Sequence, residues 1–285
     1  MTLTTRFAPS PTGPLHLGHA YSALFAHDLA KAVGGKFLLR IEDIDQSRAR
    51  PKWEAQIYED LAWLGIDWPQ PVMRQSDRMA AYHGALDDLW ARGLVYACTC
   101  NRRDIAAATS APQEGAEPVY GPDGLIYPGT CRDAGHPKAS GALRLDMRKA
   151  LASLGNRALN FTENGHGPNA ETGAITFSPD QLIATVGDVV LARRDMGTSY
   201  HLSVVLDDAA QGVTLIPRGA DLFAATYIHV VLQALLDLPT PHYHHHRLIR
   251  DDGGKRLAKR DDARAIALYR ENGMTPEDIR SMVGL

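Results

Sequence analysis

The sequence has few cysteines, no long apolar run and no large excess of charge of one sign. Its three cysteines, Cys98, Cys100 and Cys131, are too few and too clustered for a disulfide framework, so reduced thiols or metal ligands are expected. No apolar stretch approaches the roughly 18 residues that a membrane helix requires. The first residues lack the basic and then apolar pattern of a secretory signal. These absences favour a cytoplasmic protein without a membrane partner.

The charge balance argues against a broad, non-specific nucleic-acid binder, because the formal net charge is only −3. A hydrophobic content of 45% and a charged content of 22% over 285 residues indicate a globular protein with a buried core. Basic residues do gather between His246 and Arg264, where four aspartates are interleaved with them. That segment fits either a solvated surface or a loop that faces phosphate groups.

Strands and helices are predicted to alternate from the N-terminus. A strand at 4–8 precedes a proline-rich loop, and a helix then begins near Leu17 and ends before Gly34. The apolar run at 36–41 has the length of a strand covered on both faces, and a helix follows at 51–64. This order predicts an α/β fold with a Rossmann-type, doubly wound parallel sheet.

The rest of the chain is predicted to repeat the alternation after an irregular middle segment. A helix is expected at 79–92, and most of 101–124 is expected to be an irregular surface insertion. Between 141 and 177 the pattern is weak and favours short strands. The later elements are strands at 188–192 and 213–217, helices at 200–210 and 222–238, and short helices near 262–271 and 275–282. In the run His242 to His246, strand alternation would place adjacent histidines on opposite faces, so a solvated or supporting cluster is favoured over a metal site.

A pair of histidines marks the start of the first predicted helix, in the run His16-Leu-Gly-His19. The N–H groups and the positive dipole end of a helix N-terminus can bind a triphosphate. Gly18 would let a nucleotide approach the backbone where a side chain would clash. His16 and His19 could donate hydrogen bonds to phosphates as charge develops in a transition state. A proline-rich turn with surface histidines is the alternative.

A second basic motif lies about 240 residues downstream, where Arg256-Leu-Ala-Lys-Arg260 follows two glycines. A glycine-supported loop can carry ammonium groups onto phosphates during displacement. Basic loops are usually only solvated, so this motif alone does not indicate a phosphate site. It becomes more specific together with the His16–His19 motif at the other end of the α/β pattern.

Together the two motifs resemble the HIGH and KMSKS signatures of class I aminoacyl-tRNA synthetases. The runs Arg6 to His19 and Leu39 to Asp45 are similar to the glutamyl/glutaminyl subgroup, as are 198–202 and 217–221. The resemblance covers nearly the whole chain and is weakest between 101 and 170. It implies activation of L-glutamate with ATP and Mg²⁺ in a nucleotide-binding α/β site.

The resemblance also implies roles for individual residues. Arg6 and Arg218 would bind carboxylate groups of glutamate, for which the arginine fork is well suited, and Glu42, Ser10 and Tyr200 would receive its ammonium group. Without the resemblance, the acidic run at 42–45 would be interpreted as a strand-end turn or a metal site. The full expected set is Arg6, Phe7, Ala8, Pro9, Ser10, Glu42, Tyr200 and Arg218 for glutamate; His16, Gly18, His19, Arg256, Leu257, Ala258, Lys259 and Arg260 for ATP; and His16, His19 and Lys259 for catalysis.

Two departures from the subgroup stand out. Ala258 occupies the position of the usual serine of the second motif, so one hydroxyl contact to ATP is missing. Only about 25 residues follow that motif, and no anticodon-binding region is expected among them. The chain therefore resembles a truncated branch of the family, in which glutamate is esterified to queuosine in the anticodon of tRNA(Asp). We expect it to act as a monomer.

The cysteines suggest a third site. Three thiolates and a fourth donor would suit tetrahedral zinc in a structural role. The resemblance to the truncated branch implies Cys98, Cys100, Tyr127 and Cys131 as ligands. Tyrosine is an uncommon ligand because its phenol must lose a proton, so Tyr120 and His136 compete as the fourth donor. Three buried cysteines without a metal are the alternative.

These inferences predict four segments. Residues 1–95 and 186–240 would form the two halves of the Rossmann domain, 96–185 a zinc-containing insertion that contacts the acceptor, and 241–285 a short helical C-terminal tail with the second ATP motif. Three other activities stay open: a compact glutamyl-tRNA synthetase that charges the tRNA 3′ end, a non-catalytic tRNA-binding protein, and an adenylyltransferase that needs no RNA.

Overall fold

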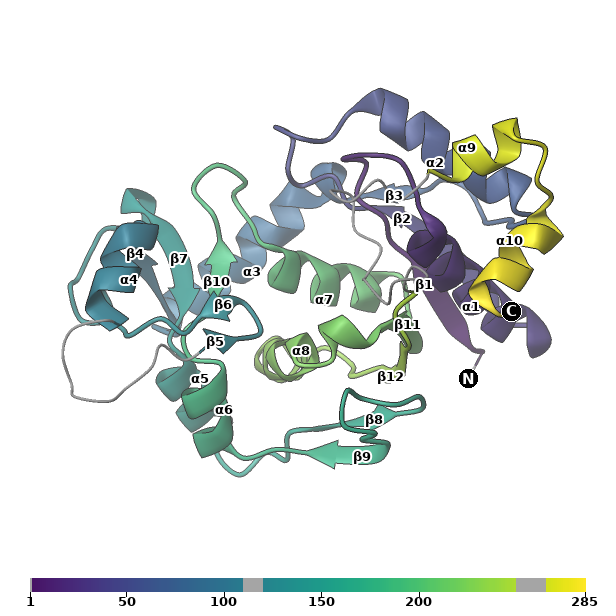
Figure 1. Cartoon of the computed structure of the whole chain (residues 1–285). Helices are drawn as coiled ribbons and strands as arrows, with labels where there is room; N and C mark the ends of the chain where they lie inside the picture. Colours follow the sequence, from purple (N-terminus) through teal and green to yellow (C-terminus); the bar gives the residue numbers. More distant parts are fainter. Residues whose placement is uncertain (1, 110–119, 250–264) are drawn as a thin grey trace.

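The computed structural model of the chain describes residues 2–109, 120–249 and 265–285. Figure 1 shows an elongated molecule with both termini at one end and the β4, β7 and β10 strands at the other. Among the described residues, no helix combines the length and the apolar character needed to cross a membrane.

A mostly parallel sheet forms the centre of the molecule. One part has the order β1-β2-β3, from β1 (Thr4–Phe7), β2 (Lys36–Ile41) and β3 (Met73–Arg74). The other has the order β11-β12-β8-β9, from β11 (Leu215–Gly219), β12 (His242–His246), β8 (Asn160–Glu163) and β9 (Gly173–Thr176), and only β9 is antiparallel. The two parts meet at β1 and β11, because the Thr214 N–H donates to the Thr4 carbonyl at 3.0 Å. The strand order therefore reverses between β1 and β11, where α/β folds form their ligand crevice.

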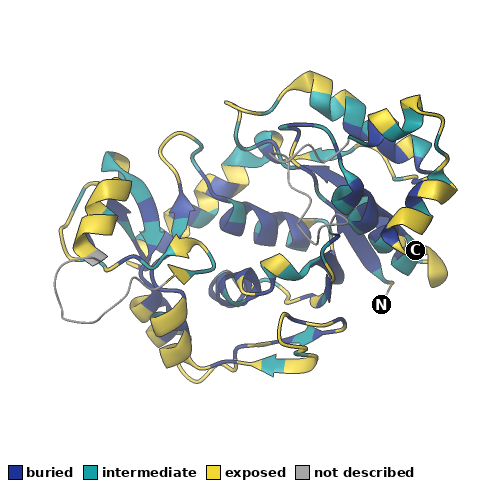
Figure 2. Ribbon diagram, in the orientation of Figure 1, coloured by how far each residue is buried: buried dark blue, intermediate teal, exposed yellow. Residues whose placement is uncertain are grey.

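Helices cover both sides of this sheet. Near β1 and β2 lie α1 (Leu17–Ala32), α2 (Pro51–Trp63), α9 (Ile266–Glu271) and α10 (Pro276–Val283), whose apolar side chains share one core cluster. A second cluster joins α3 (Met79–Ala91), α7 (Tyr200–Ala210) and α8 (Ala225–Leu235). Local caps set several helix starts: the Ser199 hydroxyl, for example, accepts from the Leu202 N–H at the start of α7. Figure 2 shows the buried faces of these helices turned toward the sheet.

The middle of the chain forms a separate antiparallel unit of order β10-β7-β4, from β4 (Val95–Cys98), β7 (Ala142–Leu145) and β10 (Val190–Ala192). Around it lie α4 (Arg102–Thr109), the β5 (Tyr120–Gly121) and β6 (Gly124–Leu125) hairpin, α5 (Met147–Leu154) and α6 (Pro179–Thr185). The same stretch of sequence also supplies β8 and β9 to the central sheet.

The short strands expected after 141 are present as β7, β8 and β9, but two helices of this middle region were not predicted. Residues 101–124 are not irregular throughout, because α4 begins at Arg102 and the Asn101 side chain caps it by accepting from the N–H groups of Arg103 and Asp104. The weak pattern after 141 hides a helix, α5, whose Asp146 cap accepts from the Lys149 N–H at 3.1 Å. Such eight-residue helices contain too few turns for their apolar period to stand out.

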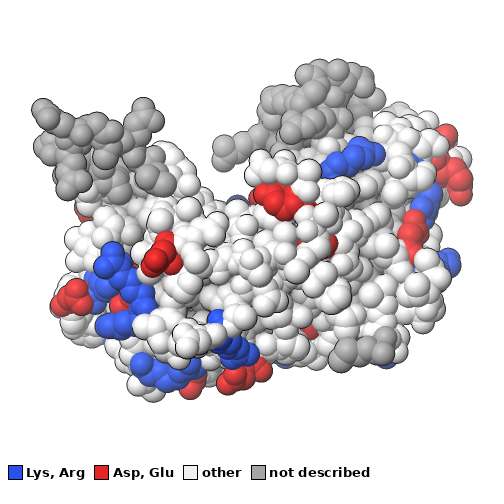
Figure 3. Space-filling view, turned by 90° about the horizontal axis from the view of Figure 1, so that it is seen from below, with Lys and Arg blue, Asp and Glu red and all other residues white. Residues whose placement is uncertain are grey.

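The surface charge agrees with the near-neutral balance of the sequence. On the face drawn in Figure 3, Lys and Arg side chains lie beside Asp and Glu rather than in one continuous basic patch. Ion pairs such as Lys138 with Asp87 and Arg157 with Asp237 occur at exposed positions.

Candidate active site

A cavity of about 470 Å³ opens at the carboxyl ends of β1, β2 and β11. It lies at the point where the strand order reverses and is bounded on one side by the N-terminus of α1. Its lining includes nearly all of the predicted glutamate and ATP residues that the structure describes: Arg6, Phe7, Ala8, Ser10, His16, Gly18, His19, Glu42, Tyr200 and Arg218. Pro9 does not line it, but its carbonyl accepts from the Glu42 N–H at 3.0 Å. Arg256, Leu257, Ala258, Lys259 and Arg260 lie outside the described residues.

The two histidines form the cap of α1. His16 precedes the helix, and its Nδ1 accepts from the Gly18 N–H at 3.1 Å. The His16 N–H in turn donates to Nδ1 of His19 at 3.2 Å, which completes a reciprocal capping box. The rings are 3.8 Å apart, and a Cβ on Gly18 would approach the His16 ring to 3.1 Å. Glycine is therefore needed for this close packing at the edge of the cavity.

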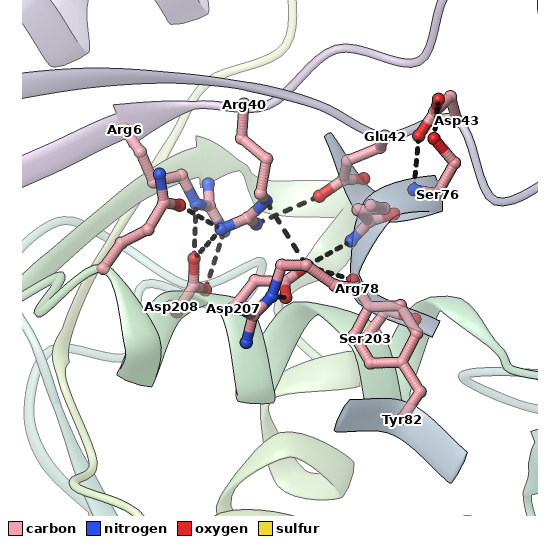
Figure 4. Close-up of polar contacts among 12 residues, drawn as sticks. Arg6, Arg40, Glu42, Asp43, Ser76, Arg78, Tyr82, Ser203, Asp207 and Asp208 are labelled. Atoms are coloured by element: carbon pink, nitrogen blue, oxygen red, sulfur yellow. Dashed lines mark hydrogen bonds and ion pairs between the residues drawn. The ribbon is translucent and has the colours of Figure 1, made fainter. Parts of the chain in front are cut away.

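A buried ionic network holds the floor of the cavity (Figure 4). Asp208 of α7 accepts from Nε of Arg6 at 3.1 Å and from NH1 of Arg40 at 2.7 Å. Arg40 also donates to Glu42 at 3.1 Å. Burial alone would raise the pKa of Asp208, but the charges of Arg6 and Arg40 outweigh that effect and lower it. For Glu42, burial dominates and raises the pKa, although Arg40 offsets part of the rise.

The neighbouring Asp207 extends the network toward α3. It accepts from Gln75 at 2.9 Å, from Arg78 at 2.7 Å and from the Tyr82 hydroxyl at 2.8 Å. Burial and this carboxylate raise the pKa of Tyr82, so its phenol stays protonated and acts as a donor. Consecutive aspartates on α7 therefore tie it to β1 and β2 on one side and to α3 on the other, and fix Arg6 and Glu42 in the cavity.

Arg218 differs from Arg6 in having no carboxylate partner among residues 2–109, 120–249 and 265–285. It is only 4% exposed and donates to His245, His229 and Thr226 at 3.1, 3.2 and 2.6 Å. No carboxylate of the described part of the chain lies within ion-pair distance of it. A buried guanidinium without a carboxylate partner is costly in free energy, so an anionic ligand beside Arg218 would be stabilised. The run at 242–246 was expected to be a solvated or supporting cluster; His245 and His246 are buried, and the contact of His245 with Arg218 agrees with the supporting alternative.

A second cavity of about 340 Å³ shares part of its wall with the first. Ser10, Glu42, Tyr200, Asp221 and Leu222 line both cavities. On its outer side the second cavity reaches Asp45, Arg48, Asp123 and Arg193, so its far wall carries charge of both signs. Sequence reasoning did not assign a binding role to these outer residues, since Asp123 and Arg193 are far from Asp45 and Arg48 in the chain.

The cysteines converge in the middle unit. Their three Sγ atoms lie within 4.8 Å of one another. The Tyr127 hydroxyl is 3.3 Å from Sγ of Cys98 and 3.4 Å from Sγ of Cys100, and the Cys100 and Cys131 sulfurs are 3.4 Å apart. Burial would raise the pKa of Cys131, but hydrogen bonds from Tyr127 and Thr99 outweigh it and lower the pKa to about 6.

The competing fourth donors are placed differently. Tyr120 is 73% exposed, in the β5–β6 hairpin, whereas Tyr127 is buried against the cysteines with the Arg144 guanidinium 4.0 Å from its ring centroid. His136 approaches Thr99, at 3.4 Å, rather than a sulfur. Three sulfurs and one phenol oxygen thus have the spacing and the chemistry of a four-donor metal site.

With this geometry in place, the relatives of the chain can be considered. The sequence matches the class I tRNA synthetase (E and Q) catalytic domain over residues 2–120 and 164–285. The chain belongs to this family. It is 62% identical over 283 residues to the glutamyl-Q tRNA(Asp) synthetase of Rhodobacter capsulatus. This match covers 99% of this chain and 100% of the relative. Identity to the protein of the same name from Geobacter sulfurreducens is 41%, over 94% of this chain and 80% of the relative.

Solved structures of the family agree. A glutamate tRNA ligase from Elizabethkingia meningosepticum, in complex with its amino acid, superposes with a TM-score of 0.77 at 26% identity. That match covers 100% of this chain and 61% of the ligase, so the chain spans less than two thirds of the larger protein. Mycobacterium tuberculosis methionyl-tRNA synthetase superposes with a TM-score of 0.63 at 11% identity over 99% of this chain and 64% of that protein, which supports the shared fold alone. The class I synthetase fold, an α/β fold with a parallel sheet and C-terminal helices, is therefore confirmed.

Proposed function

We propose that this chain activates L-glutamate with ATP as glutamyl-adenylate and transfers the glutamyl group to queuosine in the anticodon of tRNA(Asp). The observation that carries the glutamate assignment is Arg218, a buried cation in the main cavity that no carboxylate of the described residues pairs with. The acceptor assignment rests on the names of the relatives that match the chain over most of its length.

The charges of the cavity suit a bound glutamate. Arg218 would pair with one carboxylate, while Arg6 is already paired with Asp208 and would act as a weaker second donor. Glu42 and Tyr200 lie on the wall toward the second cavity and would receive the ammonium group, with Ser10 beside them. Phe7, Ala8 and Pro9 continue from β1 and would shape the pocket through their backbone.

In the first step, the α-carboxylate of glutamate would attack the α-phosphorus of ATP, the bond to the bridging oxygen would break and pyrophosphate would leave. His16, His19 and the N–H groups at the start of α1 would stabilise the charge on the phosphates. Mg²⁺ bound with the nucleotide would neutralise part of that charge. Lys259, with Arg256, Leu257, Ala258 and Arg260, is proposed to complete the ATP site from the second motif.

In the second step, a hydroxyl of the queuosine cyclopentenediol would attack the acyl carbon, and AMP would leave as its phosphate oxygen takes the hydroxyl proton. The second cavity adjoins the glutamate wall and would hold this acceptor. If this pocket receives an anticodon base, the protein does not need to align the acceptor stem of the tRNA with its active site.

Cys98, Cys100, Tyr127 and Cys131 are proposed to hold one structural Zn²⁺, because their four donor atoms can surround a single ion. When bound, the ion would join the end of β4 to the segment before β7 that carries Tyr127 and Cys131, in addition to the contact between Cys98 and Tyr127. The proposed limits of the four segments stay at 1–95, 96–185, 186–240 and 241–285. A monomer in the cytoplasm, where its tRNA partner occurs, is part of the same proposal.

The proposal is tested by incubating the protein with ATP, radiolabelled L-glutamate and tRNA(Asp) that either carries or lacks queuosine. Nuclease fragments then reveal the labelled position. Label on the anticodon fragment only when queuosine is present is the expected result. Label on the 3′-terminal fragment would indicate a charging synthetase instead, and labelling of neither fragment would overturn the RNA step. Arg218→Leu should abolish labelling, whereas Lys31→Leu, which removes an exposed lysine in the last turn of α1, should not change it.

A further inference from the structure

The hydrogen bonds around Arg218 determine the protonation of the residues that contact it. A guanidinium can only donate, so every partner atom must accept. Nε of Arg218 faces Nε2 of His245 at 3.1 Å, which places the single proton of that imidazole on Nδ1. Nδ1 faces Oε2 of Glu163 at 2.5 Å. A doubly protonated His245 would bring two N–H groups against each other, so this ring must be neutral.

Glu163 is itself held in place. Its Oε1 accepts from the backbone N–H groups of Gly165 at 2.7 Å and His245 at 2.8 Å. Burial would raise the pKa of Glu163, but these bonds and the one from the His245 ring lower it. The ionised carboxylate therefore draws the His245 proton to the side away from Arg218.

The hydrogen bonds on the opposite side of Arg218 determine the tautomers of His229 and His201 in the same way. NH1 faces Nδ1 of His229 at 3.2 Å, so the His229 proton lies on Nε2. That atom is 3.2 Å from Nδ1 of His201, which must accept, so the His201 proton lies on its own Nε2. There it faces Oδ1 of Asp123 at 3.7 Å. The chain of contacts thus ends in a carboxylate on both sides.

Burial keeps this arrangement in one state. His229 and His245 are each 1% exposed, and burial together with the Arg218 charge lowers the pKa of His229 well below its ordinary value. Burial also lowers the pKa of His245, although Glu163 offsets part of the change. Thr226 is fully buried as well, and its hydroxyl accepts from NH2 of Arg218 at 2.6 Å.

These contacts use three of the five N–H groups of Arg218, one on each nitrogen. One N–H on each terminal nitrogen is left, which is the pair that a carboxylate can bind with two parallel hydrogen bonds. We propose that His229 and His245 are positioning residues for this arginine, and that Asp123 and Glu163 fix their tautomers so that Arg218 presents that pair to the substrate carboxylate. This inference rests on the proposed function.

The first test compares substitutions that keep or remove the acceptor. The oxygen of His229→Asn can replace Nδ1, and that of His245→Gln can replace Nε2, whereas His229→Leu and His245→Leu cannot accept. We expect the leucine variants to bind radiolabelled L-glutamate about tenfold or more weakly in equilibrium dialysis and to lose selectivity for glutamate over glutamine. The amide variants should stay within about threefold of the wild-type chain.

Two controls make the result specific. ATP affinity should be unchanged in all four variants, and His242→Asn, an exposed histidine on the same strand as His245, should bind glutamate normally. Leucine variants with wild-type glutamate affinity and selectivity would overturn the positioning role. A wild-type chain that binds no glutamate would instead overturn the proposed function.

The second test does not depend on any variant being well folded. Long-range ¹⁵N–¹H correlation spectra of histidine-labelled wild-type protein report the protonated nitrogen of each ring. The expected result is a neutral Nδ1–H form for His245 and neutral Nε2–H forms for His229 and His201. The opposite tautomer or an imidazolium at His229 or His245 would overturn the inference.

Discussion

Asp60 provides a prediction whose size can be worked out from the structure. It lies on α2, is fully buried and faces Arg270 of α9, with Oδ1 3.6 Å from NH1. Neither carboxylate oxygen receives a hydrogen bond from the described residues. Burial raises the pKa of Asp60 from 3.8 to about 6, and Arg270 offsets only part of the rise.

The sign of the effect follows from proton linkage. Between pH 4 and pH 6 the folded state binds more protons at Asp60 than the unfolded state, so the free energy of unfolding falls as pH rises through this range. The rise from 3.8 to about 6 corresponds to about 3 kcal/mol, which the folded protein loses by pH 7. In Asp60→Asn the side chain cannot ionise, and this loss should vanish.

Urea unfolding of the wild-type chain and Asp60→Asn at several pH values measures the effect. The variant should gain about 3 kcal/mol relative to the wild type between pH 4 and pH 7. Glu59→Gln is the matched control. Glu59 lies on α2 next to Asp60 and also faces Arg270 of α9, but its side chain is exposed to solvent, so a change below about 0.5 kcal/mol is expected. A difference between the wild type and Asp60→Asn that stays constant with pH would refute the reasoning.

Three further predictions concern the site and its support. Glu42→Gln should weaken L-glutamate binding about tenfold at neutral pH. Because burial raises the pKa of Glu42, the glutamate affinity of the wild-type chain should fall during acidification at a pH above 4.5. Parallel pH profiles for the wild type and Glu42→Gln in equilibrium dialysis would contradict this. Cys131→Ser should reduce the zinc content, measured by mass spectrometry, from about one ion per chain to a small fraction and lower Tm, whereas unchanged metal content would exclude the proposed ligand set. Asp208→Asn should cost about 3–5 kcal/mol of unfolding free energy at pH 7, since the buried Arg6 loses its ion-pair partner and the buried Arg40 loses one of its carboxylate partners. Because the folded-state pKa of Asp208 is lowered, the cost should shrink only as pH falls below 3.8, and equal costs at pH 7 and pH 2 in urea titrations would count against the ion pairs.

Local sequence signals were sufficient to predict an element where its sequence includes a start signal, a clear apolar pattern and an end signal. The boundaries of α7 at Tyr200–Ala210 and of β2 at Lys36–Ile41 agree with the prediction. In α7 a serine cap precedes an apolar stripe, and in β2 an apolar run has the length of one buried strand. The short helices α4 and α5 were missed because each has eight residues, too few to establish a helical period.

The sequence by itself also predicted residues of the cavity, because the first motif and the resemblance name side chains such as Arg6, Glu42 and Arg218 that line it in the structure. Tertiary structure alone decided which of these residues are neutralised. Arg6 and Asp208 are 202 positions apart, and Arg40 and Asp208 are 168 apart, so no local pattern could predict that one aspartate serves both arginines. His229, which sequence reasoning did not single out, contacts Arg218 only because α8 packs beside β11 and β12. Periodicity and caps act over a few residues, whereas burial and ion pairing depend on where distant segments cross, and these fix the charge that a ligand meets.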